Sequence, residues 1–234
     1  MRFDLQNWEM EESSIHVASK TNELLDILES WTPNEDVRNL PSGPSIEFGF
    51  SVLRNVFVLR MLDQGEAIVR EWQGSHWVMM VTAARGTIET CAFAHRLFSR
   101  IESAAHLRDA DKCHELIMSG LFPTRSANAI KTGSVPAVNI LTMLEQFEKA
   151  VDGILRCHAA ASEIVHPNAS GLFKMYANAD YEQDTIQFSR TTLQPLETFG
   201  HVVFANRSLE AAIEKIESLE KIQPKLAILA RSLS

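Results

Sequence analysis

Cysteines and basic residues are scarce in this 234-residue sequence, and each shortage excludes a class of protein. The three cysteines, Cys91, Cys113 and Cys157, lie far apart and form no C-x-x-C pair. This pattern indicates reduced thiols and excludes a disulfide framework or a cysteine zinc site. The 22 basic residues are outnumbered by 30 acidic ones, and the formal charge of −8 argues against a broad phosphate-binding surface.

Long hydrophobic runs are also missing. One of the longest, WVMMVTAA from Trp77, falls far short of the roughly 20 residues that span a bilayer. The opening MRFDLQNWEMEESS carries acids where a signal peptide needs an apolar core. We therefore expect a soluble, cytoplasmic protein with no membrane contact.

The motifs of several common enzyme classes are absent. The sequence has no Gly-x-Ser-x-Gly, Walker A, dinucleotide or His-Glu-x-x-His motif. The pair Glu163-x-x-His166 occurs once, whereas ferritin-like di-metal bundles carry such a pair on each of two helices. We therefore expect neither a metal nor a cofactor.

Helical periodicity dominates what is present, and it predicts a mainly α fold. We expect one domain, a bundle of six to eight helices with a small β-hairpin near residues 173–190. Its parts are an N-terminal helix and loop (1–45), a core bundle (46–170), the hairpin (171–192) and C-terminal helices (193–234) that could serve as oligomer contacts. The expected helices cover 14–31, 46–72, 76–105, 109–118, 137–165 and 193–222, and Pro224 opens a short last one.

The expected helix 137–165 has the clearest pattern. Its apolar stripe is formed by Ile140, Leu144, Phe147, Val151, Ile154, His158, Ala161 and Val165. Pro167 ends it, because proline disfavours helical geometry at the residue before it. His158, like His95 in the helix 76–105, lies at the centre of an apolar stripe, which favours a hydrogen-bonded core histidine over a ligand.

Two polar flanks form the first candidate site. Glu163 lies about 155° from the centre of its helix's stripe and His166 about 95° from it. Arg85 and Glu89 form an i,i+4 pair on a flank of the helix 76–105. If the two helices are neighbours, Arg85 would bind Glu163 and Glu89 would face His166; otherwise Glu163 belongs to a solvated charged face.

A second candidate comes from the arginine-to-histidine spacing of HEPN-class ribonucleases, an arginine followed after four to six residues by a histidine. Arg100 with His106 and Arg108 with His114 fit this spacing, about as many matches as chance supplies. Only the second pair has a polar residue, Asp109, directly after the arginine. The other interpretation of Arg108 and His114 is a charged, exposed helix start.

Three stretches give the chain a family resemblance: ARGTIETCAFAHRL, PTRSANAIKTGSVPAVNILTMLEQFEK and the turn SEIVHPNASG. Together they resemble uncharacterised bacterial helical proteins similar to the DUF5677 and HEPN-like groups, over roughly residues 81–171. The resemblance implies an α-helical fold but no established reaction. It directs attention to Arg85, Glu89, Thr124, Arg125, Glu163, His166 and Asn168.

Two hypotheses follow for the function. In the first, a HEPN-like homodimer binds or cleaves RNA in a prokaryotic stress or defence setting, with an antitoxin-like protein as a further expected partner. Arg85 and Arg125 would contact phosphate, and His166 would be the general acid or base, oriented by Glu163. Glu89 would complete the catalytic group, and Asn168 would contact phosphate or ligand. In the second, the chain is a non-catalytic protein-interaction or ligand-sensing module, and the same polar residues form a structural latch.

Overall fold

The computed structural model of the chain describes residues 1–6, 11–32, 46–121, 138–168, 170–180, 182–189 and 195–222, together with 224, 226 and 228. These residues form a mainly α-helical bundle with one small β-hairpin, which confirms the predicted fold class. The α-helices are α1 (Glu12–Ser30), α2 (Ile46–Gln73), α3 (Trp77–His106), α4 (Ala110–Leu121), α6 (Ile140–Phe147), α7 (Ile154–Val165) and α8 (Pro195–Glu220). A short π-helical segment, η2 (Ser170–Lys174), precedes the strands β1 (Ala177–Asp180) and β2 (Thr185–Phe188).

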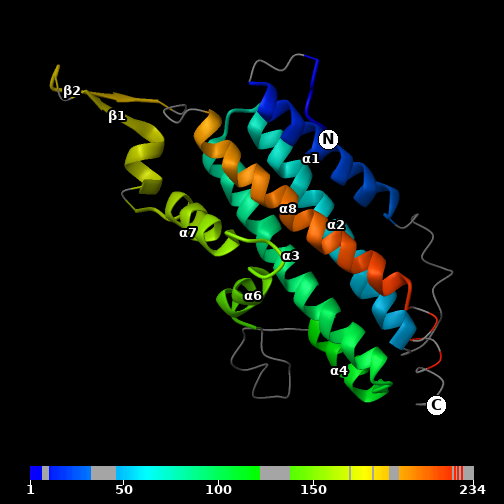
Figure 1. Ribbon diagram of the computed structural model, residues 1–234. Helices are drawn as coiled ribbons and strands as arrows, with labels where there is room; N and C mark the ends of the chain where they lie inside the picture. The colour runs from blue at the N-terminus through cyan, green and yellow to red at the C-terminus, as the bar shows by residue number, and fades with distance from the viewer. Residues whose placement is uncertain are drawn as a thin grey trace.

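Helix α3 is the centre of the bundle. It contacts α2, α4, α6, α7 and α8, and α1 packs against α2 and α8 (Figure 1). Such a helix must be apolar around much of its circumference, and its fully buried residues include Val81, Ile88, Cys91 and Phe98. The charged residues of α3 are therefore confined to its remaining flanks, and this confinement positions the candidate site.

The prediction of a single helix over 137–165 is wrong, because the structure has two helices there, α6 and α7. Gly153 has a φ of 83°, a left-handed conformation that glycine adopts without steric cost. The carboxylate of Glu148 then accepts hydrogen bonds from the amides of Gly153 and Leu155, each at 2.8 Å, at the start of α7. The apolar stripe survives the break, since Leu144, Phe147, Val151, Ile154, His158 and Ala161 are all buried.

The hairpin extends away from the bundle beyond α7 (Figure 1). Its strands pair antiparallel with Ala177 opposite Phe188 and Asp180 opposite Thr185. Asp180 accepts hydrogen bonds from the amides of Glu182 and Gln183, a local pairing that is typical of aspartate in turns. Ile186 and Phe188 share one face of β2, and both are exposed.

No helix within the described ranges combines the length and the apolar character that crossing a membrane requires.

Candidate functional site

A cluster of three polar side chains joins α3 to α7. Arg85 Nε lies 2.9 Å from Glu89 Oε1, and His158 Nε2 lies 2.9 Å from the same oxygen. The His158 side chain is only 6% exposed, against 22% for Arg85 and 33% for Glu89. Glu89 therefore connects a buried histidine to a partly exposed arginine.

The protons of this cluster follow from its geometry. An ionised carboxylate only accepts hydrogen bonds, so His158 Nε2 carries a hydrogen and donates it to Glu89. Arg85 Nε also lies 3.4 Å from His158 Nε2, but that nitrogen already carries a hydrogen and cannot accept another. Arg85 Nε therefore donates to Glu89. Burial raises the pKa of Glu89, but the hydrogen bond from His158 and the charge of Arg85 outweigh it, so the pKa lies below its ordinary value. Glu89 is consequently a carboxylate at neutral pH.

The predicted pairing of Arg85 with Glu163 and of Glu89 with His166 is wrong. Helices α3 and α7 are neighbours, as that pairing required, but the residue that meets Glu89 is His158. Glu163 follows His158 by five residues, about 140° further around the helix, so it faces away from α3. No hydrogen bond or ion pair joins Glu163 or His166 to Arg85 or Glu89, all four of which the structure describes.

The residues at the end of α7 form a local cap instead. His166 is exposed and has left the helical conformation, with φ −77° and ψ 144°, as expected for a residue before proline. Asn168 donates to Glu163 Oε2 at 2.8 Å and accepts from the amide of Gly171 at 2.9 Å. Glu163 is exposed, so the solvated-face alternative describes its surroundings.

The alternative pair, Arg108 and His114, lies at the other end of the bundle. Arg108 sits in the turn between α3 and α4 with a φ of 57°, and its amide donates to the carbonyl of Ala105. Both side chains are exposed, and no hydrogen bond joins these two described residues. Arg125 and Thr124 lie outside the residues that the structure describes.

The other histidine predicted for the core, His95, is only partly buried. Its ring packs on Phe147 with the centroids 5.2 Å apart, and burial lowers its pKa. His158 by contrast is both buried and hydrogen-bonded, as predicted.

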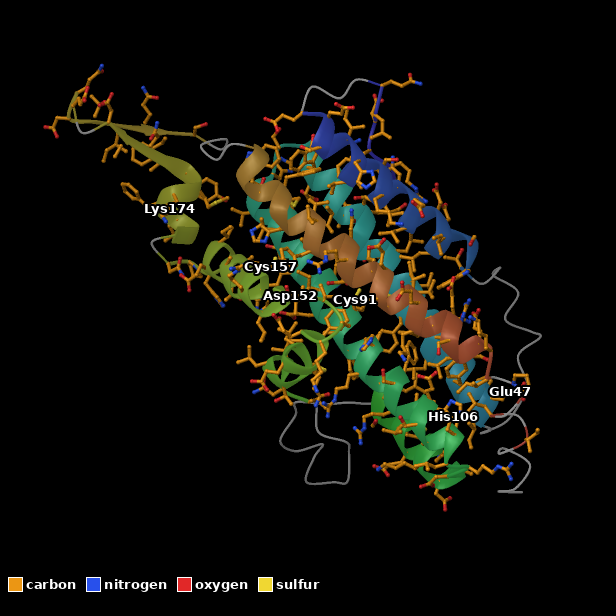
Figure 2. The ribbon with its side chains drawn as sticks, in the orientation of Figure 1. Glu47, Cys91, His106, Asp152, Cys157 and Lys174 are labelled. Carbon is orange, nitrogen blue, oxygen red and sulfur yellow. The ribbon has the colours of Figure 1, made fainter. Side chains whose placement is uncertain are left out.

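The thiols show no sign of nucleophilic activation. Figure 2 labels Cys91 on α3 and Cys157 on α7. Burial raises the pKa of Cys91 and lifts the pKa of Cys113 and Cys157 to about 11, so all three thiols are protonated at neutral pH. Cys157 Sγ lies 3.6 Å from His201 Nδ1, but burial lowers the pKa of that histidine, and it carries no charge that would stabilise a thiolate.

No group of three or more His, Cys, Asp or Glu side chains in the described ranges is arranged to hold a metal ion.

An open cavity of about 430 Å³ lies beside the cluster, between α2, α3, α4 and α6. Most of its wall is apolar: Leu53, Val56, Phe57, Phe93, Ile140 and Met143. Three polar residues also line it, Arg60 from α2 and Glu89 and Thr90 from α3. Glu89 therefore belongs both to the cluster that joins α3 to α7 and to the cavity wall.

Sequence reasoning missed this cavity and the role of Arg60. The i,i+4 spacing of Arg85 and Glu89 pointed to the correct flank of α3, but no motif marks Arg60, which is one of several arginines on α2. A cavity between four helices depends on their packing distances, and no short stretch of sequence encodes those. The pairing of Glu89 with His158 was also missed, although it had a signal, since His158 is the only polar member of its apolar stripe.

Comparison of the chain with protein-family models, with curated proteins and with solved structures finds no match. The resemblance to DUF5677 and HEPN-like proteins, the homodimer and the antitoxin-like partner therefore stay predictions.

Proposed function

We propose that this protein is a non-catalytic ligand-sensing module that takes up a small molecule between α2, α3, α4 and α6. The cavity is the observation that carries this proposal. Its volume of about 430 Å³ falls in the range of small-molecule sites, which are mostly apolar with a few polar groups that orient the ligand. Arg60, Glu89 and Thr90 supply those polar groups here.

The cluster of Arg85, Glu89 and His158 gives the cavity a means of acting on the rest of the fold. Glu89 lines the cavity, and its Oε1 atom holds His158 of α7. Helix α7 in turn contacts η2, which contacts β1 of the protruding hairpin. A ligand that contacts Glu89 therefore changes the environment of the residue that latches α7 to α3. By binding one arrangement of α7 against α3 more tightly than another, such a ligand shifts the equilibrium between them. The size of the shift is set by the difference between the two affinities.

The proposal is tested with Nile red, a neutral dye whose fluorescence rises in apolar sites. We expect saturable binding of one dye per chain. Val56→Trp places a large ring at the rim of the cavity and should abolish this binding, because Val56 lines the cavity and is 53% exposed. Leu59→Trp is the matched control, since Leu59 is on the same helix, is 47% exposed and does not line the cavity.

Two results would overturn the proposal. One is the absence of saturable dye binding to the unmodified protein. The other is an equal loss of binding in Val56→Trp and Leu59→Trp, which would locate the dye elsewhere. Circular dichroism spectra of both variants show whether the helical fold is retained.

RNA cleavage is the second candidate function, and the exposure of His166 is the observation that favours it. A general acid or base must reach its substrate, and a histidine at an exposed helix end meets that requirement, whereas buried His158 does not. The test is cleavage of a labelled single-stranded RNA by the purified protein. Activity that His166→Ala abolishes at an unchanged melting temperature would support this function, and no cleavage by the unmodified protein would exclude it for this substrate.

A further inference from the structure

Arg60, an exposed residue of α2, is the cation among the described residues that line the cavity. Its Nε donates to Oγ1 of Thr90 at 3.1 Å, which ties the base of the guanidinium to α3. Among the described residues, no carboxylate pairs with Arg60. Arg54, six residues earlier on α2, shows the contrasting arrangement, since its guanidinium contacts Glu220 through Nε at 2.9 Å and Nη2 at 2.8 Å.

The charge of Glu89 does not cancel that of Arg60. Glu89 is the acidic residue of the cavity wall, and its Oε1 atom already accepts from Arg85 and His158. No ion pair joins Glu89 to Arg60, although both line the same cavity and both are described. Arg60, Arg85 and Glu89 together carry one net positive charge.

A guanidinium fixed through Nε leaves its two Nη groups for a ligand. Two parallel N–H groups match the two oxygens of a carboxylate, a geometry that a lysine ammonium does not offer. Around this polar end, the side chains of Phe57, Phe93 and Met143 supply apolar wall. The cavity thus has one anion-binding group and an apolar body.

We infer that the ligand of this cavity is an amphipathic carboxylate, with its carboxylate on the Nη groups of Arg60 and its apolar body along Phe57, Phe93 and Met143. This inference rests on the proposed ligand-sensing function and adds the chemical class of the ligand. Arg60 confers selectivity for the anion, and the apolar wall supplies affinity for the body.

Three probes with the same eight-carbon chain separate charge from apolar contact: octanoate, octan-1-ol and octylamine. Each is added at concentrations below those at which it aggregates, and its displacement of Nile red is measured. We expect octanoate to bind roughly tenfold more tightly than octan-1-ol, since a charge-assisted hydrogen bond outweighs a neutral one, and octylamine to bind most weakly. Arg60→Gln should bring octanoate to the affinity of octan-1-ol, and Arg60→Glu should place octylamine above octanoate.

The control is Arg70→Gln. Arg70 is an exposed arginine on the same helix that pairs with Glu71 and does not line the cavity, so its removal should leave the order of the probes unchanged. This control also shows whether a general loss of positive charge weakens the binding of octanoate.

The outcomes distinguish failure of the inference from failure of the proposed function. Equal affinity for octanoate and octan-1-ol, with binding still blocked by Val56→Trp, leaves a ligand cavity but overturns the role of Arg60. If octylamine binds most tightly, the role of Arg60 is also overturned, and Glu89 is the residue that holds the charged end of the ligand. If neither Nile red nor any eight-carbon probe binds, the proposed function fails and the inference fails with it.

Discussion

The two ends of α7 carry the same residue type in opposite surroundings. Near the start of the helix, His158 is buried and donates to Glu89 of α3. Just after its end, His166 is exposed, and the glutamate and asparagine beside it bond to each other. One end of the helix is therefore tied to the bundle through a polar contact, and the other end is capped locally.

This difference comes from position on the helix surface. His158 belongs to the apolar stripe that faces α3, so its buried ring nitrogen needs a hydrogen-bonding partner, which Glu89 of α3 supplies. Glu163 is about 140° away on the same helix and stays in water, where a polar contact contributes little. Polar residues that interrupt an apolar stripe are thus the ones that stabilise this fold. A cluster of charges at a helix end is a weaker indicator of a stabilising contact.

The largest effect in this comparison is expected for Glu89→Ala. The substitution removes the acceptor of the buried His158 and the ion-pair partner of Arg85, and we expect the free energy of unfolding to fall by about 2 kcal/mol. Urea unfolding followed by circular dichroism measures this loss. Glu163→Ala is the matched control on the exposed end and should cost less than about 0.5 kcal/mol. Similar losses in the two variants would show that the ends of α7 do not differ in energy.

Gly153→Ala is expected to have the next largest effect, because Gly153 sets the direction in which α7 leaves the break. Its φ of 83° strains any residue with a Cβ atom, and the added carbon would lie 3.3 Å from the ring of Phe204. We expect a loss of about 1–2 kcal/mol in the free energy of unfolding. Gly200→Ala is the control: Gly200 is helical with open space around it, so alanine should stabilise α8 by about 0.5–1 kcal/mol. A neutral result for Gly153→Ala would mean that the break is readily rearranged.

The sequence was sufficient for most of the described fold, because apolar periodicity and proline or glycine punctuation are local signals. The ends of α2 and α3 agree with the predicted ranges to within one residue. The break between α6 and α7 was missed because the apolar stripe continues through Val151 and Ile154, which outweighed the turn signal of Asp152-Gly153.

The candidate site was predicted less well, for a physical reason. The flank of Arg85 and Glu89 was found, since an i,i+4 pair is visible in the sequence. Its partner depends on which residue of α7 lies opposite Glu89, and that is His158 of the buried stripe, whereas the polar flank that carries Glu163 faces away from α3. His158 was correctly placed in the core, but a core histidine also needs a partner, and pursuing that requirement would have led to Glu89.

Acid should weaken the contact that ties the buried end of α7 to α3. The pKa of Glu89 in the folded protein lies below its ordinary value of 4.5, so its contribution is fully present above that pH. It is lost as the pH falls through the folded pKa, because protonation removes the charge that Arg85 and His158 stabilise. Urea midpoints between pH 6 and pH 3 should fall more steeply for the unmodified protein than for Glu89→Gln. Equal slopes in the two proteins would show that Glu89 does not carry this acid sensitivity.

The smallest effect is expected at the local cap, where two hydrogen bonds meet on one side chain. Asn168→Ala removes both the bond to Glu163 and the bond from the Gly171 amide, and we expect a loss of about 0.5–1 kcal/mol. Glu163→Ala removes only the first bond, which is exposed, so the difference between the two variants belongs to the Gly171 amide. The double variant should therefore be no less stable than Asn168→Ala alone, as urea unfolding can measure. A further loss in the double variant would mean that Glu163 has a second partner, and the exposed end of α7 would then be tied to the fold in the way that its buried end is.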